Sequence, residues 1–350
     1  MMQELKIGNK TARIPIIKGG MGVGVSRSKL AGAVAAEGGI GVISSAQIGY
    51  DEEGFETDPN ACNLKAIEKH VKAAKKQANG GLVGVNIMVA LKDYKDHVKA
   101  AAFAGADLII SGAGLPVTLP ELTEGFDVKI APIVSTEKAA RILLKMWDRK
   151  YQKTADLVIV EGPDAGGHLG FSPEELSQRG QLDYDLEIRK IIRTVGAYAE
   201  KFDKKIPVVV AGGISSREDV LHALSLGADG IQAATKFVAT RECDANAAYK
   251  EAYIKAQNSD AAIIKSPVGM PGRALHNDFL EKIGQKSLKV KKCYGCLESC
   301  SPHKIPYCIT DALIRAVKGD VQNGLIFCGA NVGKITKIST VREVMKELTV

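Results

Sequence analysis

His168 has the surroundings of a residue that transfers protons. It ends the segment Glu161-Gly-Pro-Asp-Ala-Gly-Gly-His168, which directly follows the apolar run 157–160. A continuous apolar run is typical of a parallel strand covered on both faces, so we expect His168 in a glycine-rich loop beyond a buried strand. An imidazole there can exchange a proton near neutral pH. The structural alternative is a hydrogen bond that orders the loop.

His70, His97 and His222 fall in helical segments and are interpreted as surface or packing residues.

Three further loops carry glycines or small residues beyond candidate strands. Their sequences are Lys18-Gly-Gly-Met-Gly-Val-Gly24, Ala211-Gly-Gly-Ile-Ser-Ser-Arg217 and Gln232-Ala-Ala-Thr-Lys-Phe237. A phosphate needs free backbone N–H groups at close range, which glycine permits because it has no side chain. The N–H groups that we expect to cradle a phosphate are those of Gly212, Gly213, Ala234 and Thr235. The alternative is that the glycines only form tight turns or let helices pack close to strands.

Four cysteines crowd into one stretch near the carboxyl end. The segment Cys293-Tyr-Gly-Cys296-Leu-Glu-Ser-Cys300 is followed by His303 and Cys308. In a chain without secretory features, clustered cysteines indicate metal more than disulfides. We expect the four thiolates to bind an iron–sulfur cluster or zinc, with His303 as another zinc ligand. Reduced thiols without metal are the third alternative, because spacing does not identify a metal.

Strand-like and helix-like segments alternate over most of the chain. The eight candidate strands are 14–17, 39–44, 83–89, 107–111, 129–134, 157–161, 208–211 and 230–233. The candidate helices are 28–36, 64–78, 94–104, 137–150, 186–204, 217–226 and 245–256. Pro116 and Pro120 leave room for only a short helix between the fourth and fifth strands.

Eight strands that alternate with helices predict an α/β fold, a (β/α)8 TIM barrel. The runner-up is an open doubly wound sheet, which would place its glycine-rich loop after the first strand. Here the loops follow strands one, six, seven and eight, which share one mouth in a closed barrel. We expect the barrel over residues 1–275. Over residues 276–350 we expect a C-terminal extension that carries the cysteines and two helices, 309–318 and 341–348, packed against the barrel.

The bulk composition is that of a globular enzyme. The chain has 350 residues, of which 45% are hydrophobic and 25% charged, with a formal net charge of +7. The lysines are scattered over helical segments, so we expect no nucleic-acid binding, and an anionic cofactor or substrate would use the positive charge. Residues 1–10 lack a signal-like apolar core, and no run approaches the roughly 18 apolar residues of a membrane span. We therefore expect a cytoplasmic protein without membrane contact, and the sequence leaves a homodimer open.

Together these loops resemble the nitronate monooxygenase (2-nitropropane dioxygenase) family, which includes the FMN-dependent enoyl-ACP reductases. The resemblance covers residues 14–273 and rests on Pro15-Ile-Ile-Lys-Gly-Gly-Met-Gly22, Gly84-Val-Asn86, Glu161-Gly-Pro-Asp-Ala-Gly-Gly-His-Leu-Gly170 and Ala211-Gly-Gly-Ile214. It implies an FMN-binding barrel in which His168 is the catalytic residue. The FMN-binding residues that it implies are Gly20, Met21, Gly22, Asn86, Glu161, Ala165, Gly166, Gly167, Gly212, Gly213, Gln232, Ala234 and Thr235.

The resemblance implies one of two activities. A nitronate monooxygenase would oxidise alkyl nitronates with dioxygen, with His168 as acid or base. An enoyl-ACP reductase would use NAD(P)H as co-substrate to reduce an enoyl thioester on acyl carrier protein in fatty-acid synthesis. Bacterial nitronate monooxygenases often carry a lysine near the flavin after the fifth strand, whereas Pro132-Ile-Val-Ser-Thr136 has none before Lys138, a departure that the enoyl reductases share. We expect nitronate oxidation, with enoyl reduction as the alternative.

Two rivals come from other classes. A barrel similar to IMP dehydrogenase needs a nucleophilic cysteine in an active-site loop, and no cysteine lies between Cys62 and Cys243. A non-catalytic flavin-binding protein is the other rival, and it would leave His168 without a task.

Overall fold

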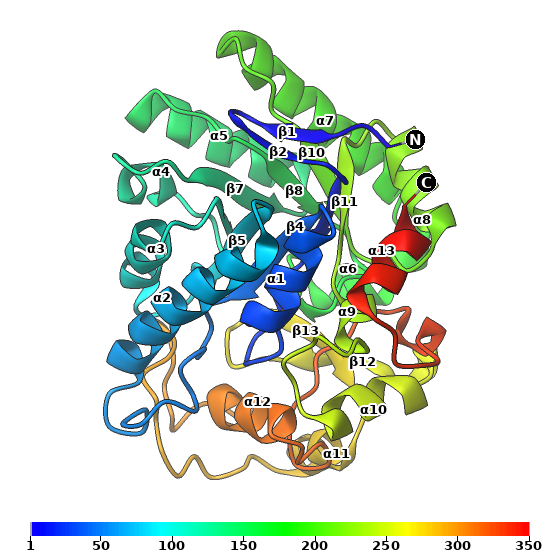
Figure 1. Cartoon of the computed structure of the whole chain (residues 1–350). Helices are drawn as coiled ribbons and strands as arrows, with labels where there is room; N and C mark the ends of the chain where they lie inside the picture. Colours follow the sequence, from blue (N-terminus) through cyan, green and yellow to red (C-terminus); the bar gives the residue numbers. More distant parts are fainter. Residues whose placement is uncertain (1, 350) are drawn as a thin grey trace.

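A closed barrel of parallel strands forms the centre of the computed structural model, which describes residues 2–349 (Figure 1). Around the barrel the strand order is β10-β11-β3-β4-β5-β6-β7-β8. The strands are β3 (Ile16–Lys18), β4 (Ile40–Ser44), β5 (Leu82–Met88), β6 (Leu108–Gly112), β7 (Lys129–Val134), β8 (Val158–Glu161), β10 (Val208–Ala211) and β11 (Gly230–Ala233). Because β3 pairs in parallel with β11, the sheet has no open edge. The predicted (β/α)8 barrel is confirmed, and the open doubly wound sheet is wrong.

Helices cover the outside of this barrel (Figure 1). They are α1 (Ser28–Ala36), α2 (Pro59–Ala78), α3 (Tyr94–Phe103), α4 (Leu119–Leu122), α5 (Glu137–Tyr151), α7 (Tyr184–Lys201) and α8 (Arg217–Ser225). After β11 come α9 (Thr235–Val238) and α10 (Ala247–Lys255), and α10 lies at the same end of the molecule as α11 (Asp278–Gln285) (Figure 1). Shorter turns in the loop after β8 are α6 (Pro173–Ser177) and the 3-10 helix η1 (Arg179–Gln181). The short α4 occupies the proline-bearing connection in which a short helix was expected.

The largest boundary difference is at the start of α2, which begins before the predicted residue 64. Asp58 accepts a hydrogen bond from the Ala61 N–H at 3.0 Å, and Pro59 occupies the first turn. An aspartate cap followed by proline is a strong helix start, because it satisfies a free N–H group and presets the backbone angle φ. Helix α7 differs in the same way, since Asp183 caps it ahead of the predicted start.

Apolar side chains form one layer inside the barrel and another between strands and helices. Ile159 points inward, whereas its neighbours Val158 and Val160 pack outward, as the two-residue period of a strand requires. The interior layer also includes Leu5 and Ile7. These two belong to a hairpin that the sequence did not reveal, formed by β1 (Leu5–Ile7) and β2 (Lys10–Ala12).

This hairpin closes the amino end of the barrel, so that the carboxyl ends of the strands form the mouth (Figure 1). Lys10 of β2 lies 3.2 Å from the carboxylate of Asp107, which immediately precedes β6. Side chains therefore fill the interior at one end, and space for a ligand is left at the other.

The C-terminal extension packs on the barrel. Its helices are α11 (Asp278–Gln285), α12 (Ile309–Val317) and α13 (Val341–Leu348), with a 3-10 turn η3 (Val332–Lys334). Helix α13 contacts α1, α8 and α9 on the outside of the barrel. Helix α12 lies at the opposite end from the β1–β2 hairpin (Figure 1). Helix α11 was not predicted.

A second sheet lies at the mouth and was also not predicted. It contains β9 (Gly167–His168), β12 (Ala261–Lys265) and β13 (Pro271–Leu275), and β13 pairs antiparallel with both of the others. The 3-10 turn η2 (Asn258–Asp260) directly precedes β12. Gly272 pairs with His168, and Ala274 bridges to Phe327 of the extension. The sheet therefore links the loop after β8 to the C-terminal extension.

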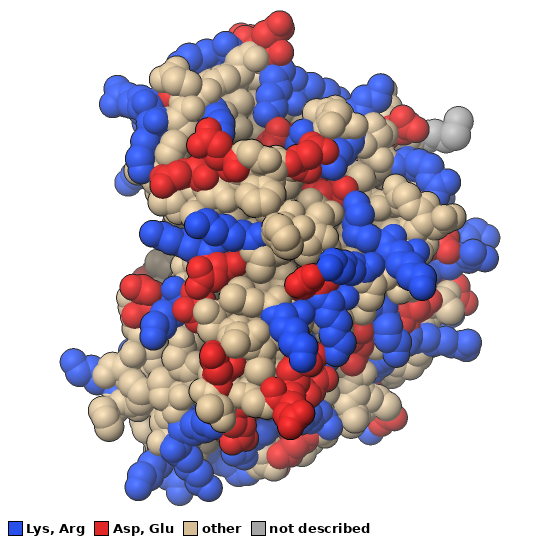
Figure 2. All heavy atoms as spheres, turned by 60° about the vertical axis from the view of Figure 1, so that its left-hand side comes forward, with Lys and Arg blue, Asp and Glu red and all other residues tan. Residues whose placement is uncertain are grey.

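Charged side chains of both signs mix on the surface. On the face in Figure 2, lysine and arginine are interspersed with aspartate and glutamate. Examples are the pairs Lys69–Glu52 at 2.6 Å and Lys153–Glu124 at 3.4 Å. Within residues 2–349, none of the helices combines the length and the apolar character that a membrane crossing needs.

Gly41 marks the place where α1 packs most closely on β4. A Cβ atom at this position would lie 1.8 Å from the backbone oxygen of Ala31, and backbone cannot rotate out of the way. We expect Gly41→Ala to lower the free energy of unfolding by about 3 kcal/mol, measured by urea denaturation. Gly284→Ala in α11 is the control, because an added Cβ there meets no atom within 4 Å. Its stability should stay the same or rise by up to about 1 kcal/mol. Equal stability of Gly41→Ala and the parent protein would contradict the close packing of α1.

Candidate active site

Two adjoining cavities occupy the mouth of the barrel. We call the first the glycine cavity, with a volume of about 600 Å³, and its lining includes Asp164, Ala165, Gly212, Gly213 and Lys334. The second, the histidine cavity, has a volume of about 1090 Å³, and its lining includes Gly20, Met21, Gly22, Asn86, Gly167 and His168. The residues that line both are Glu161, Gly166, Gln232, Ala234 and Thr235. Every residue predicted to bind FMN, and His168, therefore lines one or both of these adjoining cavities.

Free backbone N–H groups give the glycine cavity its chemistry. Gly212 and Gly213 have φ angles of +95° and +81°, which side chains other than glycine rarely allow. Their N–H groups donate no hydrogen bond to any of residues 2–349. Across the cavity α9 begins at Thr235, and the first N–H groups of a helix have no partner within it. This arrangement suits an anion such as phosphate.

Side-chain capping holds the loop after β10 in place. Ser216 accepts a hydrogen bond from the Asp219 N–H at 3.3 Å, and the Asp219 carboxylate accepts the N–H of Ser216 at 2.9 Å. This capping box starts α8 at Arg217, as the sequence predicted.

The C-terminal extension completes the glycine cavity. Asn331 donates from Nδ2 to the backbone oxygen of Gly213 at 2.7 Å, and the Gly329 N–H donates to Thr235 Oγ1 at 3.0 Å. Sequence reasoning missed both residues, because they lie about a hundred residues beyond the loops that they contact and carry no motif of their own.

His168 sits between two residues that the sequence analysis did not identify. Its Nε2 atom lies 2.8 Å from Ser266 Oγ, and its ring centre lies 5.0 Å from that of Phe327 in an edge-on arrangement. Ser266 Oγ also accepts the Val268 N–H at 3.3 Å, which fixes the hydroxyl in the β12–β13 connection. Ser266 therefore sets the orientation of the imidazole.

Enclosure by protein keeps the imidazole of His168 uncharged. Loss of solvation lowers its pKa from the ordinary 6.5 to about 4, because the charged form is disfavoured away from water. Near neutral pH the ring can accept a proton. It is not an imidazolium that could donate one.

Glu161 is a second titratable group at the junction of the two cavities. Loss of solvation raises its pKa to about 7, so the carboxyl group is partly protonated near neutral pH. Its backbone oxygen accepts the Tyr184 hydroxyl at 2.9 Å, and the same hydroxyl lies 3.0 Å from the Ser135 oxygen. Tyr184 thus ties the end of β8 to the end of β7.

Apolar side chains form much of the remaining wall of the histidine cavity. They are Met88, Ile133, Tyr249, Tyr253, Leu313 and Phe327. Tyr249 and Tyr253 come from α10 and Leu313 from α12, so segments beyond the barrel strands shape this wall. Such a wall limits access of water to His168.

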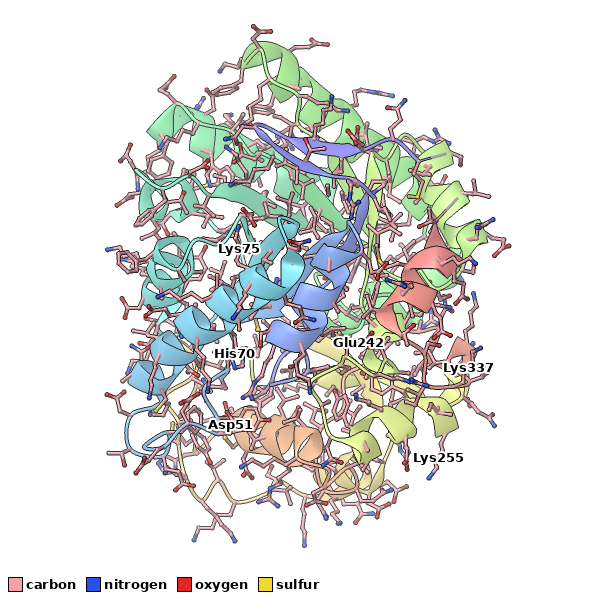
Figure 3. The ribbon with its side chains drawn as sticks, viewed as in Figure 1. Asp51, His70, Lys75, Glu242, Lys255 and Lys337 are labelled. Carbon is pink, nitrogen blue, oxygen red and sulfur yellow. The ribbon has the colours of Figure 1, made fainter. Side chains whose placement is uncertain are left out.

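Other histidines have structural contacts. His97 Nδ1 lies 3.1 Å from Ser45 Oγ in the core, and His70 Nδ1 lies 3.0 Å from Ser28 Oγ. Figure 3 labels His70 on α2 and Asp51 in the loop before that helix. Of the six histidines, all within the described chain, His168 alone lines the two cavities.

The cysteine cluster differs from the prediction. Cys293, Cys296, Cys300 and Cys308 all line one separate cavity of about 740 Å³ that also contacts Lys92. Within residues 2–349, however, no group of three or more His, Cys, Asp or Glu side chains is placed to hold a metal ion. All four are free thiols, and burial raises the pKa of Cys296 to about 11. The structure therefore does not support the predicted iron–sulfur or zinc site, because close spacing along the chain does not by itself bring the sulfur atoms to a common centre.

The fold and the cavities define a (β/α)8 barrel with a ligand site at its mouth. The family model for nitronate monooxygenase matches residues 3–350, and the chain belongs to this family, whose members are generally FMN-dependent enzymes. The match extends through the C-terminal extension, beyond the range 14–273 of the motifs. Family membership also sets aside the non-catalytic alternative.

Individual relatives agree with the family assignment. A probable nitronate monooxygenase from Staphylococcus saprophyticus is 26% identical over 302 residues, which cover 79% of this chain and 80% of the relative. The structure of FabK from Thermotoga maritima is 26% identical and matches with a TM-score of 0.73 over 96% of this chain and 91% of that chain. A nitroalkane oxidase from Streptomyces ansochromogenes matches with a TM-score of 0.71 over 96% and 94%, and at 20% identity it supports the fold alone.

The enclosure of His168 has a measurable consequence. We expect its imidazole to titrate with a midpoint near pH 4, followed by NMR and assigned by comparison with His168→Gln. Because the folded-state pKa lies below the ordinary 6.5, the unfolded chain binds the extra proton between these values. Stability therefore decreases as the pH falls from about 6.5 to about 4, and this decrease should be smaller in His168→Gln. A midpoint near 6.5 would show that the ring is solvated.

Proposed function

We propose that this oxidoreductase binds FMN and oxidises alkyl nitronates with dioxygen, with His168 as its acid–base residue. The observation that carries the proposal is the position of His168, uncharged and hydrogen-bonded to Ser266, in a cavity that adjoins the phosphate-type glycine loops. The name of the staphylococcal relative and the family model support this choice of substrate.

The residues present fit FMN. The glycine cavity offers the N–H groups of Gly212 and Gly213 to a phosphate, and a side chain at either position would meet neighbouring atoms. The larger histidine cavity, with Met21 and Asn86 on its lining, would hold the ring system. When bound, FMN would accept the electrons of the substrate and pass them to dioxygen.

His168 is suited to take up a proton. Because its ring is uncharged near neutral pH, it can remove the proton from the carbon beside a nitro group and so produce the anionic nitronate within the site. Ser266 holds the ring in position during this transfer, and the apolar wall with Tyr249 and Phe327 restricts water.

Enoyl reduction is the second candidate, and two observations favour it. The structural match to FabK covers nearly the whole chain, and the stretch after β7, which contains Ser135, has no lysine. This reaction ends with protonation of a carbon beside a thioester. We place nitronate oxidation first because the family model and the staphylococcal relative both carry nitronate monooxygenase in their names.

Anaerobic stopped-flow reduction of the purified protein distinguishes the two candidates. Reduction of the flavin absorbance band by a small alkyl nitronate alone, and none by NADH or NADPH, is expected for a nitronate monooxygenase. Fast reduction by a pyridine nucleotide, followed by reoxidation with an enoyl thioester, would establish the enoyl reductase instead. A protein that responds to neither belongs to another reaction class.

Replacement of His168 tests its role. We expect His168→Ala to retain FMN and to slow flavin reduction by a neutral nitroalkane, whose proton beside the nitro group must first be removed, about 100-fold or more, the usual effect of losing a general acid or base. His222→Ala is the matched control, because His222 is exposed and pairs with Asp185 away from both cavities. Unchanged reduction in His168→Ala would remove the residue from the mechanism.

A further inference from the structure

Arg273 is a fully buried arginine without an acidic partner. It lies in the middle of β13, and its exposed fraction is 0%. Its Nη1 atom donates to the backbone oxygens of Pro163, at 2.7 Å, and Ala165. Its Nε and Nη2 atoms have no hydrogen-bond partner among residues 2–349. A buried cation in this state is costly unless a negative charge compensates it.

No carboxylate of the described chain fills this role. Asp164 is close enough to act on Arg273 electrostatically, but it pairs with Arg179 at 3.2 Å and is about half exposed. The neighbouring thiol of Cys328 has a pKa that burial raises to about 12, so it is uncharged. Within residues 2–349, therefore, no acidic side chain pairs directly with Arg273, and the half-exposed Asp164 compensates its charge only in part.

The guanidinium group lies directly behind the wall of the glycine cavity. The two carbonyl groups that it binds belong to the segment 163–166, whose Ala165 and Gly166 line that cavity. On the strand itself, Arg273 pairs with Gly167, next to His168. One arginine thus holds both the loop that faces the anion site and the strand that carries the histidine.

We propose that Arg273 is a positioning residue that tunes the protein for FMN over its dephosphorylated form, riboflavin. Its two hydrogen bonds fix the loop 163–166, and the phosphate dianion in the glycine cavity supplies the negative charge that Asp164 provides only in part. A charge across one layer of peptide acts through a medium of low polarity, where attraction is stronger than in water. This inference rests on the proposed binding of FMN.

Flavin titrations of the full-length apoprotein test the proposal. Fluorescence titration with FMN and with riboflavin gives the ratio of the two affinities for the parent protein, Arg273→Met and Arg273→Lys. In Arg273→Met we expect the affinity for FMN to fall about tenfold or more and that for riboflavin to change less than about twofold. Arg273→Lys keeps the charge and should retain most of the preference for FMN. Arg141→Met is the matched control, because it removes an exposed arginine that pairs with Glu137 and lines neither cavity, so it should leave the ratio unchanged.

The possible results separate the proposal from its premise. An equal loss of affinity for both flavins in Arg273→Met would mean that the residue only holds the loop. No loss of affinity for either flavin would remove the residue from flavin binding. Both results overturn the proposal. If Arg273→Met does not fold, as judged by circular dichroism, Arg273→Lys tests the proposal instead. This variant retains the charge, so a loss of its preference for FMN also overturns the proposal. Failure of the parent protein to bind either flavin would instead refute the proposed function.

Discussion

The pairing of β3 with β11 is the constraint on which the site depends. This contact closes the barrel, and closure makes β8, β10, β11 and β3 neighbours although they are widely separated along the chain. Parallel strands all end at the same rim, so the glycine loops beyond them face one space. In an open sheet the first and last strands would not be hydrogen-bonded to each other, and the loops beyond them would not face the same ligand. The β1–β2 hairpin at the other end fills the interior and leaves this rim as the mouth.

The chemistry at the mouth depends on the segments that cover it, the β12–β13 hairpin and the C-terminal extension. The β12–β13 hairpin brings Ser266 to His168, and the extension brings Phe327 and Asn331 over the two cavities. These segments remove water from the imidazole and from Glu161, and they shift the two pKa values in opposite directions for the same physical reason, the cost of a charge away from water. A histidine on the same loop without this cover would be an ordinary exposed group.

Local signals explain why much of the barrel was predictable. Short strand-like segments in alternation with helical ones identified all eight barrel strands, and the spacing of residues 28–36 matched α1. The predicted helix 217–226 begins where α8 does, at Arg217. Strand β9 has two residues and no periodicity, so its pairing with β13 depends on partners about a hundred residues away. The cysteines are the opposite case, because their close spacing suggested a metal site, whereas within residues 2–349 no group of three or more ligand side chains is placed to hold a metal ion.

The sequence by itself determined the alternation of strands and helices, the glycine loops and the identity of His168 as the candidate for chemistry. These features are local, since they follow from residue types and spacing within short segments. Tertiary structure alone decided that the loops meet, that Ser266 orients His168 and that Arg273 binds the loop 163–166 of the glycine cavity. It also decided the protonation of His168 and Glu161. These properties depend on distance and on exclusion of water, which arise when remote segments pack together and which no local pattern encodes.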